Sequence, residues 1–293
     1  MRGDVLKNKV FSRAALCLSA LFVLGDAIIM LPTKDGANYT FFGFLAAAVA
    51  GIALYFLISL IYNKIPTDGN FIVKTIESVF LVIVAVFSVF AAANTFSVFT
   101  RFASEVILKN IPIPIINSVF LIVVVYFAFK RQEAVLKFSL ICFVLIFILI
   151  IFFLLASLGD YRLENLAFEE SFDWEVFYKS VKSFIPNPVI PALILPFYYR
   201  FALNERHISA HLGVIVGYLL LGLAVISSLL LFGTELSAVL SFPHFSAVST
   251  ITVGRLYTRL DGFLYFVYFV TSIIKINVCI FICYSCLKRL SNN

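Results

Sequence analysis

The chain has 293 residues, of which 62% are hydrophobic and 13% are charged, and its formal net charge is +6. Soluble domains carry about 25% charged residues, so this composition excludes a soluble globular protein. Apolar runs of about twenty residues recur along the whole length, which excludes a β-barrel and predicts an all-α polytopic membrane protein. The charge distribution does not indicate nucleic-acid binding.

Eight apolar stretches are predicted to cross the membrane within a single permease-like domain that covers residues 1–293. We expect these helices at about 14–31, 39–62, 71–100, 111–129, 136–158, 181–203, 208–232 and 260–287. All five cysteines lie in or at the ends of these runs, which disfavours disulfides and zinc sites. No metal and no cofactor are predicted.

The distribution of basic residues predicts the topology. With the N-terminus inside, the inner segments hold thirteen of the 22 Lys and Arg residues, the outer segments hold eight, and one lies within a helix. The outer eight are Lys34, Arg101, Lys109, Arg162, Lys179, Lys182, Arg255 and Arg259. The positive-inside rule therefore places both termini in the cytoplasm.

The one basic residue at membrane depth is Lys275. It lies eleven residues from either end of the apolar run Leu264–Cys286, too deep for its ammonium to reach the interface easily. A charge at that depth costs about 2.5–3.5 kcal/mol even on insertion scales, so the fold must offset it. Either the lysine is solvated by carbonyls between packed helices, or it faces a polar cavity that binds a ligand or ion.

Two of the predicted helices are interrupted. The first contains Gly25-Asp26-Ala27, and the sixth contains four prolines within eleven residues, from Pro186 to Pro196. Each interior proline removes a backbone hydrogen bond, and freed carbonyls at membrane depth are tolerated only in protein or beside a polar cavity. Breaks in the first and sixth helices are typical of a five-plus-five inverted repeat, in which the broken segments face the substrate near the midplane. A kinked packing helix is the alternative for the sixth.

Three stretches agree in order and spacing with a known family. The first is Ser12–Pro32, with its glycine break and closing Leu-Pro, and the second is Ile185–Tyr199, in the place of a broken sixth helix. The third is Ser241–Leu287, which contains Phe242-Pro243, Val253–Leu256, Arg259–Asp261 and Lys275-Ile276. Together they resemble the spore germination permease family, the B subunits of bacterial germinant receptors, within the amino acid–polyamine–organocation superfamily.

The resemblance implies a broken-helix, leucine-transporter-like fold, here without the last two of ten helices. The chain departs from the family at Gly25-Asp26-Ala27, where relatives have a Gly-x-Gly-like break, and at Pro188-Val189, where relatives often have Gly-Glu. In relatives that couple to sodium, the metal lies between the first and eighth helices. By resemblance, the Lys275 ammonium would occupy the place of that ion.

The first and eighth helices each carry one charge at depth and are neighbours in folds of this type. We therefore predict that Asp26 and Lys275 pair, which lowers the cost of burying each; otherwise they point into different cavities. Other polar residues at depth either line the same cavity or only hydrogen-bond between helices, and these are Asn94, Thr95, Ser272 and Asn277. The predicted substrate-binding residues are Gly25, Asp26, Ala27, Asn187, Pro188, Pro191 and Tyr198, with Asp26 and Lys275 as the mimic of an ion site.

The resemblance implies a permease-like subunit of a spore germinant receptor that binds a small nutrient, such as an amino acid, within the membrane. Its partners would be a large membrane subunit, a lipoprotein and the lipid bilayer, in the bacterial cell membrane or the spore inner membrane. The sequence holds no Ser-His-Asp, phosphate-loop or paired-carboxylate arrangement, so an enzyme is not expected. The alternatives are a secondary amino-acid transporter and a degenerate subunit that binds nothing.

Overall fold

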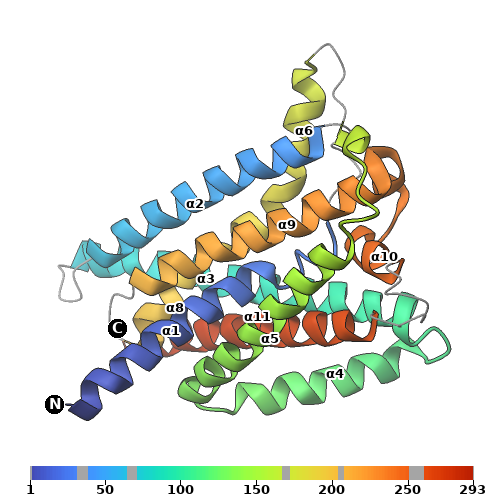
Figure 1. Cartoon of the computed structure of the whole chain (residues 1–293). Coiled ribbons are helices and arrows are strands. Elements are labelled where there is room, and N and C mark those ends of the chain that lie inside the picture. Colours follow the sequence, from blue (N-terminus) through green and yellow to red (C-terminus); the bar gives the residue numbers. More distant parts are fainter. Residues whose placement is uncertain are drawn as a thin grey trace.

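A computed structural model of the chain describes residues 2–31, 39–64, 71–166, 172–203, 208–250 and 261–292. All secondary structure in these ranges is helical (Figure 1). The α-helices are α1 (Arg2–Leu24), α2 (Thr40–Lys64), α3 (Phe71–Phe102), α4 (Ile113–Ala128), α5 (Gln132–Ala156), α6 (Trp174–Phe184), α7 (Ile190–Ala192), α8 (Leu195–Leu203), α9 (Ile208–Val239), α10 (Pro243–Ser249) and α11 (Asp261–Asn292). Shorter π and 3-10 segments are η2 (Ala103–Ile107), η3 (Leu163–Leu166) and η4 (Ile185–Val189).

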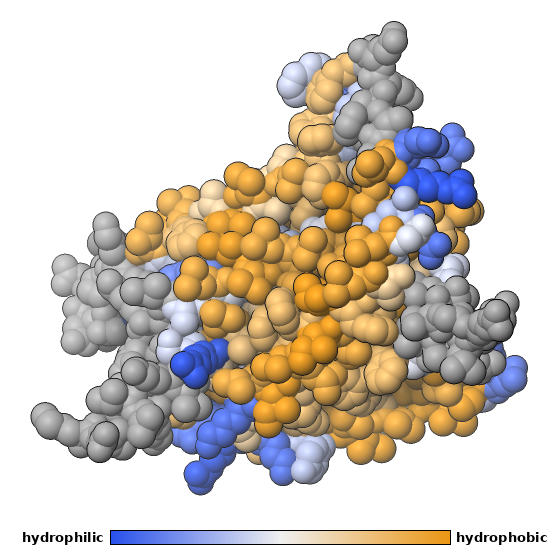
Figure 2. Space-filling view, viewed as in Figure 1, coloured by the Kyte–Doolittle hydropathy of each residue, from blue (hydrophilic) through white to orange (hydrophobic). Residues whose placement is uncertain are grey.

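Within the described ranges, five helices are long and apolar enough to cross a membrane, and two shorter apolar helices accompany them. The five spans are Thr40–Tyr62, Glu77–Ile107, Gln132–Ala156, Ser209–Val239 and Gly262–Ser291, and the shorter helices are Phe11–Leu24 and Ile113–Ala128. Large apolar side chains cover the outside of the bundle, and hydrophilic residues gather near its ends (Figure 2). The chain is therefore a polytopic helical membrane protein, as its composition predicts.

The helix α1 lies at the centre of the bundle, where it packs along α9 and α5, while α11 packs along α3. Small residues allow the close approach of α1 and α9. A Cβ atom added at Gly213 would lie 2.2 Å from the Leu16 carbonyl oxygen, and one at Gly217 would lie 2.8 Å from Cβ of Val23. Packing through small residues is how helices associate tightly in lipid, where the solvent supplies no hydrophobic driving force. This contact holds the broken end of α1 in the interior.

Both predicted breaks are present. The helix α1 ends at Leu24, and residues 25–29 form turns in place of a continued helix. The predicted helix at 181–203 is divided into the end of α6, η4, α7 and α8. The helix α6 also begins earlier than expected, at Trp174, because the side chain of Asp173 accepts hydrogen bonds from the backbone N–H groups of Glu175 and Val176.

The first helix begins and the last helix ends at the same end of the bundle (Figure 1). The helix α3 runs from that end to the opposite one, and α11 returns antiparallel beside it. The inverted repeat itself stays a prediction.

Candidate functional site

A buried ion pair lies where the break in α1 meets α11. The Lys275 ammonium donates to Oδ1 of Asp26, and the two side chains are 1% and 0% exposed. The predicted pairing of these two charges is therefore present. Two full charges inside a membrane protein require both mutual attraction and further hydrogen bonds to offset the cost of removing them from water.

Two asparagines supply those further hydrogen bonds. Asn94 Nδ2, from α3, donates to the second carboxylate oxygen of Asp26 at 3.0 Å. Asn187 Oδ1, from η4, accepts from the Lys275 ammonium at 3.1 Å. The site therefore joins four segments: the end of α1, the middle of α3, the break at η4, and the middle of α11.

Gly25 makes room for the lysine. Its φ of +28° is one that L side chains rarely adopt, and an added Cβ would lie 2.5 Å from Cδ of Lys275. The hydroxyl of Thr271 lies 3.2 Å from the Gly25 carbonyl oxygen, a group that the break in α1 leaves free, and 2.9 Å from the Val267 carbonyl oxygen of its own helix. A glycine is needed here for both conformation and space, and the next residue, Asp26, is turned towards α11.

The break at the prolines of the sixth predicted helix supplies the second backbone segment of the site. Asn187 has φ −157° and ψ 118°, an extended backbone inside a helical region, and Pro188 follows it through a cis peptide bond. This extended residue carries its amide towards Lys275. Pro188, Pro191 and Ala27 are buried beside the two breaks and offer no side-chain polar atom.

The structure does not bring Tyr198 to the ion pair. Its hydroxyl donates to Oε1 of Gln132 at 3.0 Å, and its ring packs on Phe281 with 5.5 Å between centroids. Phe281 is six residues beyond Lys275, which corresponds to about 9 Å along α11. The other predicted binding residues lie at the two breaks.

Several buried polar side chains of α3 and α11 have no hydrogen-bond partner among the described residues, and these are Thr95, Tyr268, Ser272 and Asn277. Ring contacts between Phe99 and Phe269 and between Phe102 and Tyr268 set the antiparallel register of α3 and α11. This register places Thr95 at the level of Ser272. Each buried polar group without a partner costs about 1–3 kcal/mol. Of the four, Thr95 directly follows Asn94, and Ser272 lies about one helical turn before Lys275.

Three of these four orphaned residues carried a recognisable signal, polarity at membrane depth, but Tyr268 did not. A tyrosine in a phenylalanine-rich helix looks like packing, and only its complete burial without a hydroxyl partner marks it.

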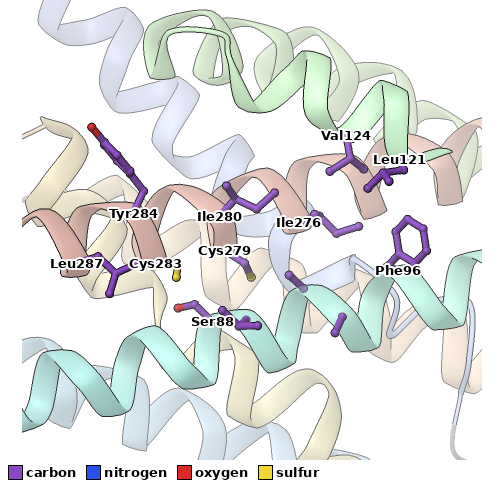
Figure 3. A pocket seen from close by; sticks show the side chains of 13 residues that line it. Ser88, Phe96, Leu121, Val124, Ile276, Cys279, Ile280, Cys283, Tyr284 and Leu287 are labelled. Atoms are coloured by element: carbon purple, nitrogen blue, oxygen red, sulfur yellow. The ribbon is translucent and has the colours of Figure 1, made fainter. Parts of the chain in front are cut away.

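A separate groove of about 470 Å³ lies beside α11, between α3 and α4 (Figure 3). Its lining includes Ala92, Val124, Ile276, Cys279 and Cys283, and it contains no charged side chain. It is suited to apolar contents and not to a charged or zwitterionic ligand. Within the described ranges, no three His, Cys, Asp or Glu side chains come together as a metal site would require.

Broken helices that meet at buried charges define a class: polytopic membrane proteins of the permease type, whose sites are built from discontinuous helices. The family comparison specifies this further. Residues 9–291 match the spore permease family, described as spore germination protein, and the chain belongs to that family. Membership gives it a permease-like role in germination and favours a non-enzymatic protein. No match was found among curated proteins or among solved structures.

Part of the resemblance rests on residues that lie outside the described ranges. These are Pro32, Val253–Leu256 and Arg259-Leu260.

Proposed function

We propose that this chain is the permease-like subunit of a spore germinant receptor and binds a small nutrient, an amino acid, at the ion pair. The supporting observation is that the backbone breaks at Gly25 and Asn187 meet at the buried Asp26–Lys275 pair, beside polar groups without partners. An amino acid carries both charges that this pair presents. Its ammonium would bind Asp26, and its carboxylate would bind Lys275.

Binding would act through a conformational equilibrium. A ligand that separates Asp26 from Lys275 stabilises a different arrangement of the α1 break against α11, and the difference in affinity for the two arrangements sets the size of the response. The partners that read this change would be a large membrane subunit and a lipoprotein. The protein would reside in the bacterial cell membrane or spore inner membrane with both termini in the cytoplasm.

The test is binding of a panel of labelled amino acids to the purified protein. We expect saturable binding by the wild type and its loss in the double variant Asp26→Asn/Lys275→Met, which removes both charges together and leaves neither one buried alone. The control Lys179→Met changes an exposed lysine of α6 and should bind as the wild type does. Binding that survives in the double variant would place the nutrient elsewhere.

A second measurement separates the receptor from a secondary amino-acid transporter. Uptake of the bound amino acid into liposomes that contain the purified protein would favour the transporter, whereas binding without uptake would favour the receptor.

A further inference from the structure

Exposed residues on one face of α3 change from apolar to polar between Phe90 and Asn94, about two-thirds of the way along the helix. Towards its start, exposed residues on this face are apolar and include Val79, Ile83, Val86 and Phe90. From Asn94 onwards the exposed residues on the same face are polar, and they are Asn94, Ser97 and Arg101. At about 100° per residue, all seven positions fall within an arc of about 80°. With Glu105, which pairs with Arg101 at 2.7 Å, the three polar residues form what we call the polar stripe.

The inner end of the polar stripe is the ion pair. Asn94 is exposed, yet its amide donates to the fully buried carboxylate of Asp26. The outer end is the exposed Arg101–Glu105 pair, whose side chains are 54% and 43% exposed. Eleven residues separate Asn94 from Glu105, which is about 16 Å of helix, or about half of a ~30 Å hydrocarbon core. The polar stripe therefore spans one half of the membrane.

Exposed polar side chains at this depth are unfavourable against lipid. A face in contact with acyl chains is expected to stay apolar up to the interface, as the first half of this face does. Polar residues in the second half are stable only against water or protein.

On the opposite side of the ion pair, contacts between side chains join the helix ends. At the start of α3, Glu77 is buried and pairs with Arg289 of α11 at 2.7 Å. Nearby, the Arg200 guanidinium lies 4.3 Å from the ring centroid of Tyr62, and that ring packs on Phe197 at 4.2 Å. These contacts tie together the ends of α2, α3, α8 and α11 on the side where the chain begins and ends (Figure 1).

We propose that the polar stripe lines a water-filled route from the C-terminal end of α3 to Asn94, whose amide holds the buried Asp26 carboxylate. The route brings small polar solutes from one side of the membrane as far as Asn94, which contacts the ion pair directly. Its use by a nutrient rests on the function proposed above, whereas the presence of water along it does not.

Accessibility of single cysteines to a charged, membrane-impermeant methanethiosulfonate tests the route, because only a hydrated thiol ionises and reacts. The background is the full chain in proteoliposomes with its five native cysteines replaced by alanine. Ser97→Cys is nearly isosteric, so it should fold normally. The matched control is Phe90→Cys, on the same face of α3 and itself 69% exposed, but in the apolar half.

We expect Ser97→Cys to react at least about 10-fold faster than Phe90→Cys, because water reaches the first thiol and lipid surrounds the second. Equal, slow reaction at both positions would overturn the proposal. The comparison needs no ligand, so its failure is independent of the binding test. If Ser97→Cys reacts quickly in protein that binds no amino acid, the route stands and the proposed function fails.

Discussion

At the scale of single residues, the stability of the folded protein depends on Asp26 and Lys275 being present together. Removing one charge leaves the other buried without a partner, which typically costs about 3–5 kcal/mol. We therefore expect Asp26→Asn and Lys275→Met each to lower the free energy of unfolding by about that amount. The double variant should be more stable than either single variant, because it leaves no unpaired charge. Unfolding in detergent, followed by circular dichroism, measures all three.

The exposed pair Glu175–Lys179 provides the control for these three variants. Its charged atoms lie 2.7 Å apart, but its side chains are mostly in solvent, so Glu175→Gln should change stability by less than about 1 kcal/mol. A double variant of Asp26 and Lys275 whose loss equals the sum of the two single losses would contradict the pairing.

His244 is the second residue with a specific prediction. It lies in α10, outside the five spans, and neither ring nitrogen has a hydrogen-bond partner in the part of the chain that the structure describes. Burial lowers the pKa of its imidazole to about 4, from an ordinary value of about 6.5. Between these values the unfolded chain binds a proton that the folded protein does not. Stability is therefore complete above about pH 6.5 and falls as the pH drops towards 4.

The variant His244→Gln removes this titration. Thermal unfolding of the wild type between pH 7 and pH 4.5 should show a steeper loss of stability than the variant, by an amount on the order of 3 kcal/mol at most. If the stability of the two proteins fell in parallel with pH, His244 would bind its proton equally well in the folded and unfolded states, and the prediction would be wrong.

At the scale of elements, the kink in α9 depends on Gly233. Its φ of 71° and ψ of 177° lie in a region that essentially only glycine occupies. Near the kink, the Leu230 carbonyl accepts from the Arg162 backbone N–H at 3.1 Å and from Asn165 Nδ2 at 2.8 Å. Gly233→Ala should therefore lower the free energy of unfolding by about 1–3 kcal/mol.

Gly262→Ala in α11 is the matched substitution for Gly233→Ala. A Cβ added at Gly262 meets no atom within 4 Å, and alanine favours a helix by about 0.5–1 kcal/mol. Its melting temperature should stay unchanged or rise. If both variants lost the same amount of stability, a side chain at position 233 would cause no special backbone strain, and the prediction would be wrong.

The sequence predicts the broken elements well because glycine, proline and buried charge act locally. The four prolines and Gly25-Asp26 locate both breaks, and the rule that charges in a membrane find partners predicts the Asp26–Lys275 pair. The position of Tyr198 was not predictable in this way. Its direction follows from how α8 packs on α5 and α11, and such packing depends on contacts between distant segments. The early start of α6 had a local signal, the N-cap Asp173, that hydrophobicity alone overlooks.

At the scale of the whole molecule, the orientation in the membrane is a prediction that combines charge and architecture. The helix α1 begins and the helix α11 ends at the same end of the bundle. The basic turn Lys130-Arg131, which joins α4 to α5, lies at that end too. The positive-inside rule places that end in the cytoplasm. Alkaline phosphatase is active only outside the cytoplasm, so its fusion after Asp160, which follows α5, should be active. Its fusion after Arg131 should be inactive, and a C-terminal green fluorescent protein should fluoresce. The reverse pattern of activities would show that the protein has the opposite orientation in the membrane. The polar stripe of α3 would then open to the cytoplasm, where no external nutrient could enter it.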